Sequence, residues 1–113
     1  MTGDDFRELA LGLDGVIERA HMRHPDFRVN GRILATLTAD EREGVVMLLP
    51  EEQHHLIDEH PTIFRPAAGA WGRQGCTVVR LAEANSRVVK GPLLLAWQHA
   101  MEKQPAKARN RKR

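Results

Sequence analysis

The dipeptide Asn30-Gly31 constrains the fold of this 113-residue chain more than any other feature. It lies between two β-like runs, at about 26–29 and 32–38. A two-residue type I′ turn needs positive φ angles at both central positions, and Asn and Gly tolerate these angles best. The sequence therefore predicts a β-hairpin that turns at Asn30-Gly31.

The register of this hairpin follows from the length of its turn. A two-residue turn places Val29 opposite Arg32 and Arg28 opposite Ile33. Because successive side chains on a strand point to opposite faces, Arg28 and Arg32 are expected on opposite sides of the ribbon. Both could touch one partner only if the hairpin projected beyond the sheet as a wing.

Hydrophobic periodicity predicts three helices and three further strands around the hairpin. We expect helices over about 4–12, 50–59 and from 85 or 86 to 104, strands at about 16–21, 44–49 and 76–81, and a turn-rich segment over 64–75. Gly91-Pro92 is expected to kink or restart the last helix, because proline has no N–H to donate. Hairpin-length connections predict an antiparallel sheet. The fold class is thus α+β: a two-layer sandwich, α-β(3–4)-α-β(2)-α, with helices on one face.

Charge is distributed unevenly along the chain. The net charge is +2, but the last eleven residues hold six basic side chains and no acidic one. Residues 1–102 hold the other 11 basic residues and all 15 acidic ones, a net charge of −4. We therefore predict one domain over 1–102 and a disordered basic tail over 103–113. Within the domain, basic residues gather at 19–32 and 61–82, so the sheet is expected to be basic and the helices acidic.

Composition favours a cytoplasmic protein. No apolar run approaches the roughly 18 residues that cross a bilayer, so no membrane partner is expected. The N-terminus is acidic and lacks the apolar region of a secretory signal. The single cysteine, Cys76, has no intramolecular partner for a disulfide, which favours a reducing compartment.

Several stretches in a fixed order carry a resemblance to a known family. They are Phe6–Leu11 with Gly15-Val16, His24-Pro25 through Asn30-Gly31 to Leu37, Leu49–Gln53, Phe64–Ala67, and Trp71-Gly72 with Gly75 and Thr77. Over about residues 4–101 the chain resembles the MmcQ/YjbR family of small bacterial proteins. That resemblance implies an α-β-β-β-α-β-β-α fold and DNA binding through a double-wing arrangement of hairpins. The chain departs from the family at Ala70 and Cys76, where aromatic residues are common, and at Gly91-Pro92.

Five residues are the candidates for nucleic-acid binding: Arg28, Asn30, Arg32, Arg65 and Arg73. A β-ribbon fits the major groove of DNA, and arginine binds guanine edges or phosphates with two donors at once. Two tryptophans, three phenylalanines and no tyrosine make a poor platform for stacking single strands, so double-stranded DNA is the expected partner. The basic tail would add non-specific contacts to phosphates.

Two other interpretations of these residues remain open. The arginines can instead be solubilising charges paired with the acidic helices. The chain can also be a non-catalytic module for protein or ligand interaction, with a chaperone-like fold and an exposed apolar patch around Trp71 and Phe64.

Metal binding and catalysis are not expected. His21, His24, His54, His55, Asp58 and His60 lack the spacing of a structural zinc site. Cys76 begins a strand predicted to be buried, where a lone cysteine acts as a small core residue. Residues 69–75 lack the lysine and the following helix of a phosphate loop. We therefore predict no enzyme activity, no metal and no cofactor.

Overall fold

A computed structural model describes residues 1–102 of the chain. The tail predicted over 103–113 lies outside the described residues. The elements are α1 (Gly3–Leu11), β1 (Ile17–His21), β2 (His24–Val29), β3 (Arg32–Leu37), β4 (Glu43–Met47), α2 (Pro50–Glu59), β5 (Phe64–Pro66), α3 (Gly69–Arg73), β6 (Cys76–Arg80), a 3₁₀ turn (Leu81–Glu83) and α4 (Ser86–Glu102).

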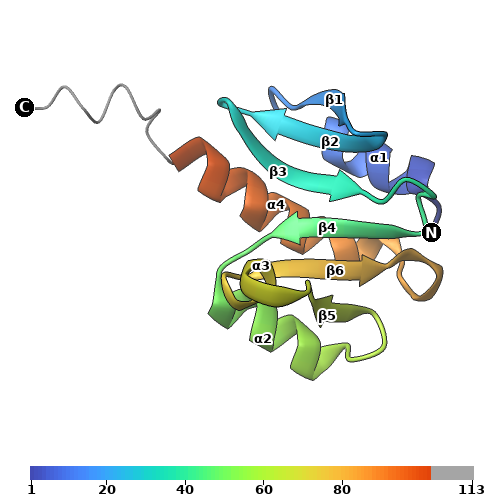
Figure 1. Ribbon diagram of the computed structural model, residues 1–113, viewed down its shortest axis with the longest axis vertical. Coiled ribbons are helices and arrows are strands. Elements are labelled where there is room, and N and C mark those ends of the chain that lie inside the picture. The colour runs from blue at the N-terminus through green and yellow to red at the C-terminus, as the bar shows by residue number, and fades with distance from the viewer. Residues whose placement is uncertain (103–113) are drawn as a thin grey trace, which may run out of the picture.

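The strands form one antiparallel sheet in the order β1-β2-β3-β4-β6-β5. Figure 1 looks onto one face of this sheet, and α1 and α4 lie behind it, packed against the other face. Helix α2 packs beside β5 and β6 at the lower end of the sheet (Figure 1). The predicted two-layer α+β sandwich is confirmed.

Helix α1 forms because its first turn is capped and one of its faces is apolar. The Thr2 hydroxyl accepts from the Asp5 backbone N–H at 3.1 Å, and the Asp5 carboxylate accepts from the Thr2 N–H at 2.9 Å. Phe6 is fully buried and meets Phe27 of β2 edge to face at 6.1 Å. A Cβ atom at Gly44 of β4 would lie 2.7 Å from the Phe6 ring, so glycine is required there for the helix to reach the sheet.

Helix α4 runs through Pro92 as one helix, so of the expected kink or restart the restart does not occur. The spacing of its apolar residues predicts a stripe along one side of the helix, made of Leu93, Ala96, Trp97 and Ala100. The structure confirms it, since Leu93, Ala96 and Ala100 are buried and Trp97 is partly buried against the core. Val89 before the proline and Leu93 after it are both buried, so packing supports the helix on both sides of Pro92, where the sequence alone favoured a kink or a restart. Its start at Ser86 agrees with the prediction, and the described helix ends at Glu102.

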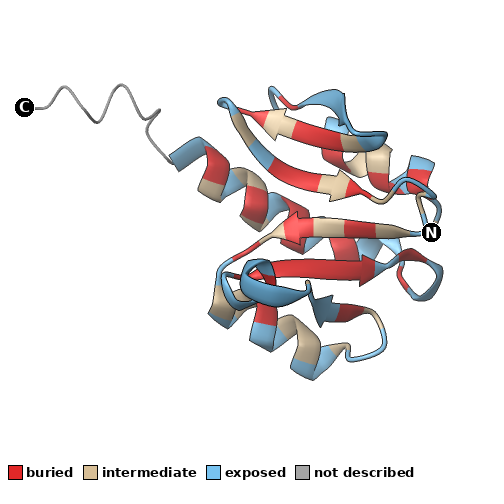
Figure 2. Ribbon diagram, in the orientation of Figure 1, coloured by how far each residue is buried: buried red, intermediate tan, exposed pale blue. Residues whose placement is uncertain are grey.

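The segment 64–75 contains more regular structure than predicted. It forms the short strand β5 and the five-residue helix α3. Phe64, part of the exposed apolar patch that the interaction-module interpretation requires, is 1% exposed and belongs to the core. Figure 2 shows its neighbour β6 buried along nearly its whole length. Period-2 alternation predicts Cys76, Val78 and Arg80 on one face of this strand and Thr77 and Val79 on the other, and the strand pairing agrees.

Strand β3 contains an irregularity that the sequence pattern did not reveal. Phe27 pairs with Ala35, whereas the next residue, Arg28, pairs with Ile33, so Leu34 has no residue directly opposite. Such a bulge lets two successive side chains share one face, and Leu34 and Ala35 are both fully buried. The predicted pairs at the tip, Val29 with Arg32 and Arg28 with Ile33, are confirmed.

Candidate nucleic-acid interface

The two faces of the sheet carry different side chains. Residues directly opposite one another on paired strands share a face, and Gly44, which lies against Phe6, marks the face covered by helices. We call the other side the open face. Its strand residues, identified from the register, are Ile17, Arg19, His21, His24, Asp26, Arg28, Ile33, Thr36, Glu43, Val45, Met47, Arg65, Cys76, Val78 and Arg80.

Arg28 lies on the open face and is held by a carboxylate of its own strand. Its Nε donates to Asp26 Oδ1 at 2.7 Å and one terminal nitrogen donates to Asp26 Oδ2 at 3.1 Å. The Asp26 side chain is almost completely buried beneath this pair. These hydrogen bonds raise the pKa of Arg28 further above its ordinary value.

Arg65 lies on the same face in β5 and is paired in the same way. Its guanidinium contacts both carboxylate oxygens of Glu43, at 2.8 and 3.1 Å, and these bonds raise its pKa. Both partner carboxylates, Asp26 and Glu43, come from strands. The alternative in which acidic helices neutralise the arginines therefore does not describe Arg28 or Arg65.

Asn30 and Arg32 belong to the other side of the hairpin. Arg32 pairs with Val29 on the helix-covered side and lines a cavity beside the end of α4. The Asn30 amide donates to the Ala100 carbonyl of α4 at 3.1 Å. The Asn30-Gly31 turn thus lies against α4 and is not a free-standing wing.

The five predicted residues do not converge on one point. Arg28 and Arg65 share the open face but are separated by four strand spacings, roughly 19 Å. Arg73 ends helix α3 and is exposed, with no ion pair among the described residues. Asn30 and Arg32 lie behind the sheet relative to these three.

The register adds two arginines that sequence reasoning placed in basic segments but did not select. Arg19 of β1 faces Asp26, and Arg80 of β6 faces Glu43, so both lie on the open face. Both are exposed, and neither side chain has a hydrogen bond or ion pair with residues 1–102. Period-2 alternation would have assigned them to this face once the strand order was known.

A second hairpin tip is exposed at the other end of β2. Strands β1 and β2 turn at Met22-Arg23, where φ is +49° and +69°. Met22 is 80% exposed, and the Arg23 side chain is exposed beside it. Such angles are unfavourable for both residue types, so Met22-Arg23 is not a sequence that predicts a turn.

Helix α3 presents Trp71 to solvent, where 69% of the residue is exposed. The helix is fixed from below by the buried amide of Gln53, which donates to the carbonyls of Gly72 at 3.0 Å and Cys76 at 2.9 Å. A Cβ atom at Gly72 would lie 1.9 Å from the Ala67 carbonyl oxygen, and one at Gly75 would lie 1.9 Å from that of Leu48. Trp71 is therefore held outward by a backbone with no room to shift.

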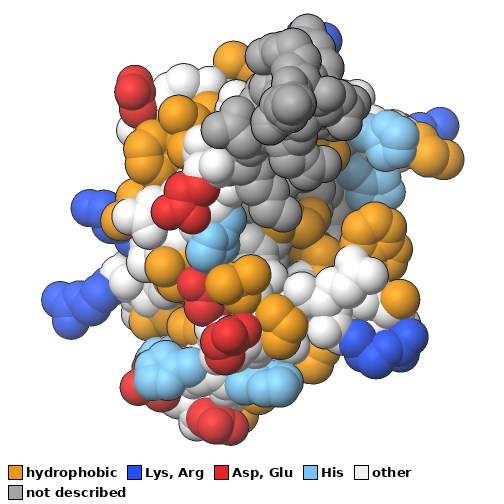
Figure 3. Space-filling view, turned by 90° about the vertical axis from the view of Figure 1, so that its left-hand side faces the viewer, with side chains coloured by type: hydrophobic (Ala, Val, Ile, Leu, Met, Phe, Trp, Pro, Cys, Tyr) orange, Lys and Arg blue, Asp and Glu red, His pale blue; other side chains and the backbone are white. Residues whose placement is uncertain are grey.

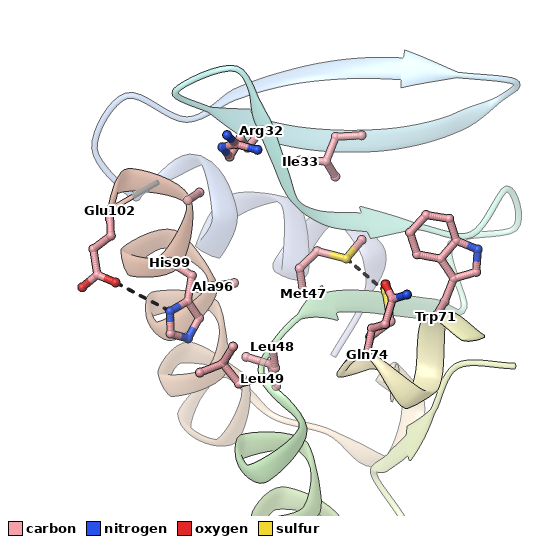
Figure 4. Close-up of a pocket in the computed structure, with 12 residues that line it drawn as sticks. Arg32, Ile33, Met47, Leu48, Leu49, Trp71, Gln74, Ala96, His99 and Glu102 are labelled. Atoms are coloured by element: carbon pink, nitrogen blue, oxygen red, sulfur yellow. Dashed lines mark hydrogen bonds and ion pairs between the residues drawn. The ribbon is translucent and has the colours of Figure 1, made fainter. Parts of the chain in front are cut away.

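Trp71 borders a cavity of about 290 Å³ where β3 and β4 separate beyond Ala35 and Val46. In Figure 4, Arg32 and Ile33 lie above it, Trp71, Gln74 and Met47 on one side, and His99 with Glu102 on the other. Figure 3, which faces this end of the molecule, shows apolar side chains gathered among histidine and carboxylate groups.

Two details fix the walls of this cavity. The Cys76 thiol donates to Met47 Sδ at 3.1 Å, and burial raises the pKa of Cys76, so the thiol remains protonated at neutral pH. On the opposite wall, His99 Nε2 lies 3.0 Å from both carboxylate oxygens of Glu52, which joins α4 to the start of α2.

Among residues 1–102, no group of three histidine, cysteine or acidic side chains is arranged to hold a metal ion. The histidines of α2 remain on its surface, where His55 lies 3.5 Å from Glu59 one turn away. Within the same residues, no helix is both long and apolar enough to cross a membrane.

The structure defines a two-layer α+β protein with an open, arginine-bearing sheet face. This fold is similar to the crystal structure of protein DR2400 of Deinococcus radiodurans, which carries a DUF419 domain, the MmcQ/YjbR-like family. The TM-score is 0.76, the sequences are 19% identical, and the match covers 96% of this chain and 86% of that one. No protein-family model and no curated protein sequence matches the chain.

Proposed function

We propose that this chain is a bacterial, cytoplasmic member of the MmcQ/YjbR family that binds double-stranded DNA through the open face of its sheet, without catalysing a reaction. The observation that carries the proposal is the charge on that face. Four arginines from four strands, Arg19, Arg28, Arg65 and Arg80, stand against two carboxylates, Asp26 and Glu43. A sheet face that exposes arginines and has excess positive charge suits the phosphate backbone of DNA.

The distribution of acidic residues also favours binding of DNA to the open face. Helices α1 and α2 carry seven acidic residues and one arginine, Arg7. Arg7 is engaged with Glu18 and Glu41, each at 3.0 Å. Because the acidic helices lie away from the open face, DNA would approach the sheet side and be repelled from the helical side.

The arginines on this face should contribute unequally. Arg19 and Arg80 can contact phosphates directly. Arg28 and Arg65 are already paired with carboxylates, so each must give up part of its ion pair before it contacts a phosphate. Each new phosphate contact releases counterions and steepens the dependence of affinity on salt, by roughly 0.9 units of log–log slope per contact. The unpaired arginines therefore carry most of the expected salt dependence.

The test is a salt titration of binding to a blunt DNA duplex by the full chain and its R19A/R80A variant. We expect the slope to become shallower by roughly 2 in the variant, because two phosphate contacts are lost. Arg87→Ala, which removes an exposed arginine from α4, is the matched control and should leave the slope unchanged.

A chain ending at Glu102 separates the sheet from the tail, whose six basic residues could alone give a slope of roughly −5. If this shorter chain does not bind the duplex, the proposal fails and only a non-specific tail contact remains. Equal salt slopes of duplex binding for R19A/R80A and Arg87→Ala would also contradict the proposal that DNA binds the open face.

A second candidate function is a protein-interaction module. It is favoured by the apolar side chains exposed around the cavity, Ile33 at 39%, Leu49 at 45% and Trp71 at 69%. Exposed tryptophan beside aliphatic residues is common at the centres of binding interfaces. Loss of a co-purified protein partner in Trp71→Ala, with unchanged DNA binding, would support this function over the first.

A further inference from the structure

We propose that the cavity beneath Trp71 binds one unpaired nucleobase, either of a free nucleotide or of a DNA strand that crosses the open face. This inference deepens the proposed function and rests on it for the strand-borne base. It concerns residues that played no part in the duplex contacts described above.

The size and lining of the cavity select a small flat ligand. Its 290 Å³ lies at the lower limit of the roughly 300–1,000 Å³ typical of ligand pockets, which is room for one ring system. Apolar and sulfur-bearing side chains line the interior, namely Ile33, Met47, Leu48, Leu49 and Cys76. Thioether sulfur makes favourable contacts with aromatic rings, so a planar aromatic group suits this lining better than an aliphatic chain.

Trp71 supplies a surface on which a base can stack. Its indole is exposed at the mouth of the cavity, and the buried hydrogen bonds of Gln53 fix the helix that carries it. A tryptophan whose backbone is already held in place loses only side-chain freedom when a ligand stacks on it. This pre-organisation distinguishes Trp71 from the other exposed apolar residues of the chain.

Gln74 supplies hydrogen-bonding groups at the cavity, which a nucleobase can use and an apolar ligand cannot. It follows Trp71 by one helical turn and borders the cavity in Figure 4. Its side-chain amide makes no hydrogen bond with the described residues. An amide offers one acceptor and two donors, which matches the edge of an adenine.

One exposed arginine, adjacent in sequence to residues that line the cavity, can contact a phosphate attached to the base, on the side opposite Glu102. Arg73, between Trp71 and Gln74 in sequence, is exposed and has no ion pair within residues 1–102. Met47 and Cys76 line the cavity and also belong to the open face, so the cavity opens beside the arginine-bearing surface. A strand bound on that face would pass the cavity mouth.

The test uses the fluorescence of Trp71 in the otherwise full chain. Trp97→Phe leaves Trp71 as the sole tryptophan, at the cost of one hydrogen bond to the Asp14 carbonyl. Deoxyadenosine monophosphate should quench this fluorescence, whereas deoxyribose 5-phosphate, which lacks the base, should not. Equal quenching by the two, or quenching by neither, would overturn the proposal.

The source of the base is distinguished with two duplexes of equal charge, one blunt and one with a short adenine overhang. Stacking of one base is expected to make Trp71→Ala bind the overhang duplex roughly tenfold more weakly, with blunt-duplex affinity unchanged. Leu94→Ala, which truncates an exposed leucine on α4 outside this cavity, is the matched control. Quenching by the mononucleotide without an overhang preference would assign the site to free nucleotides.

Failure of this proposal and failure of the proposed function give different results. If R19A/R80A leaves the duplex salt slope unchanged but the mononucleotide still quenches Trp71, the cavity binds nucleotides and the open face does not bind DNA. If 1-anilinonaphthalene-8-sulfonate quenches Trp71 and nucleotides do not, the cavity serves an apolar partner and the inference is overturned.

Discussion

The two hairpins that share β2 differ in what holds them. The β2–β3 hairpin turns at Asn30-Gly31, has fully buried residues in β3, and is tied to α4 through the Asn30 amide. The β1–β2 hairpin turns at Met22-Arg23, and every residue of β1 is exposed. The hairpin with the stronger turn signal is thus the packed one, and the hairpin with the less favourable turn carries the exposed charges. A strong turn sequence indicates where a chain reverses, and says nothing about whether the reversal projects into solvent.

The largest difference in stability should appear between β3 and β1, the strands that the two hairpins do not share. Leu34→Ala in β3 removes a fully buried side chain and should lower the unfolding free energy by about 2–5 kcal/mol. Ile17→Ala in β1 removes a side chain that is half exposed and should cost less than about 1 kcal/mol. Urea denaturation measures both. Similar losses would show that β1 is as firmly integrated as β3.

Substitutions at the two hairpin tips should also differ in their effect on the unfolding free energy, but by less. Asn30→Ala loses the hydrogen bond to Ala100 and puts alanine at a φ of +57°, so the unfolding free energy should fall by about 1–2 kcal/mol. Met22→Ala, at the same position of the other turn, loses no contact and should change it by less than about 0.5 kcal/mol. Thermal or urea unfolding of the two variants would contradict the comparison if Met22→Ala were the more damaging.

Replacing the unfavourable turn should stabilise the protein. The M22N/R23G variant gives the first hairpin the turn residues of the second, and relief of two positive φ angles should raise the unfolding free energy by about 1 kcal/mol. The reverse exchange, N30M/G31R, puts Met and Arg into the second turn and should lower the unfolding free energy. An unchanged denaturation midpoint in M22N/R23G would mean that the Met22-Arg23 turn carries no strain.

The smallest expected effect separates stability from binding. Arg23→Ala should leave the unfolding free energy unchanged but make the salt slope of duplex binding shallower by about 1, because one phosphate contact is removed. Anisotropy titrations at several salt concentrations measure this slope, with Arg87→Ala as the control. A slope identical to that of the unchanged chain would remove the β1–β2 tip from the interface.

Much of the fold could be predicted from local pattern. The bounds of α2, the apolar stripe of α4 and the pairing at the Asn30-Gly31 tip depend on residues close together in sequence, where helix caps, turn residues and periodicity act directly. The short elements β5 and α3 escaped prediction because long-range bonds maintain them. Gln53 reaches across to Gly72 and Cys76, and no periodicity within 64–75 records that contact.

The candidate site was less predictable than the fold. Arg28 and Arg65 were selected from sequence and share the open face, whereas Arg32, selected on the same grounds, lies on the other side. Arg19 and Arg80 reach the open face only through their pairing with β2 and β4. Alternation along one strand predicts which of its side chains share a face. It does not predict which side chains of different strands share a face, because that depends on the strand order and on the bulge at Leu34.

The sequence by itself determined the longer elements, the class of fold and the acidic character of α1 and α2, because these follow from residues that act locally or in sum. The expectation of acidic helices does not hold for α4, which carries Arg87 and Lys90 against Glu102. The tertiary structure decided which hairpin is tied down and which is exposed. It also decided which arginines keep a free guanidinium on the open face, and that Trp71 stands over a cavity. Each of these depends on partners distant in the chain, such as Ala100 for Asn30, Glu43 for Arg65 and Gln53 for the helix of Trp71.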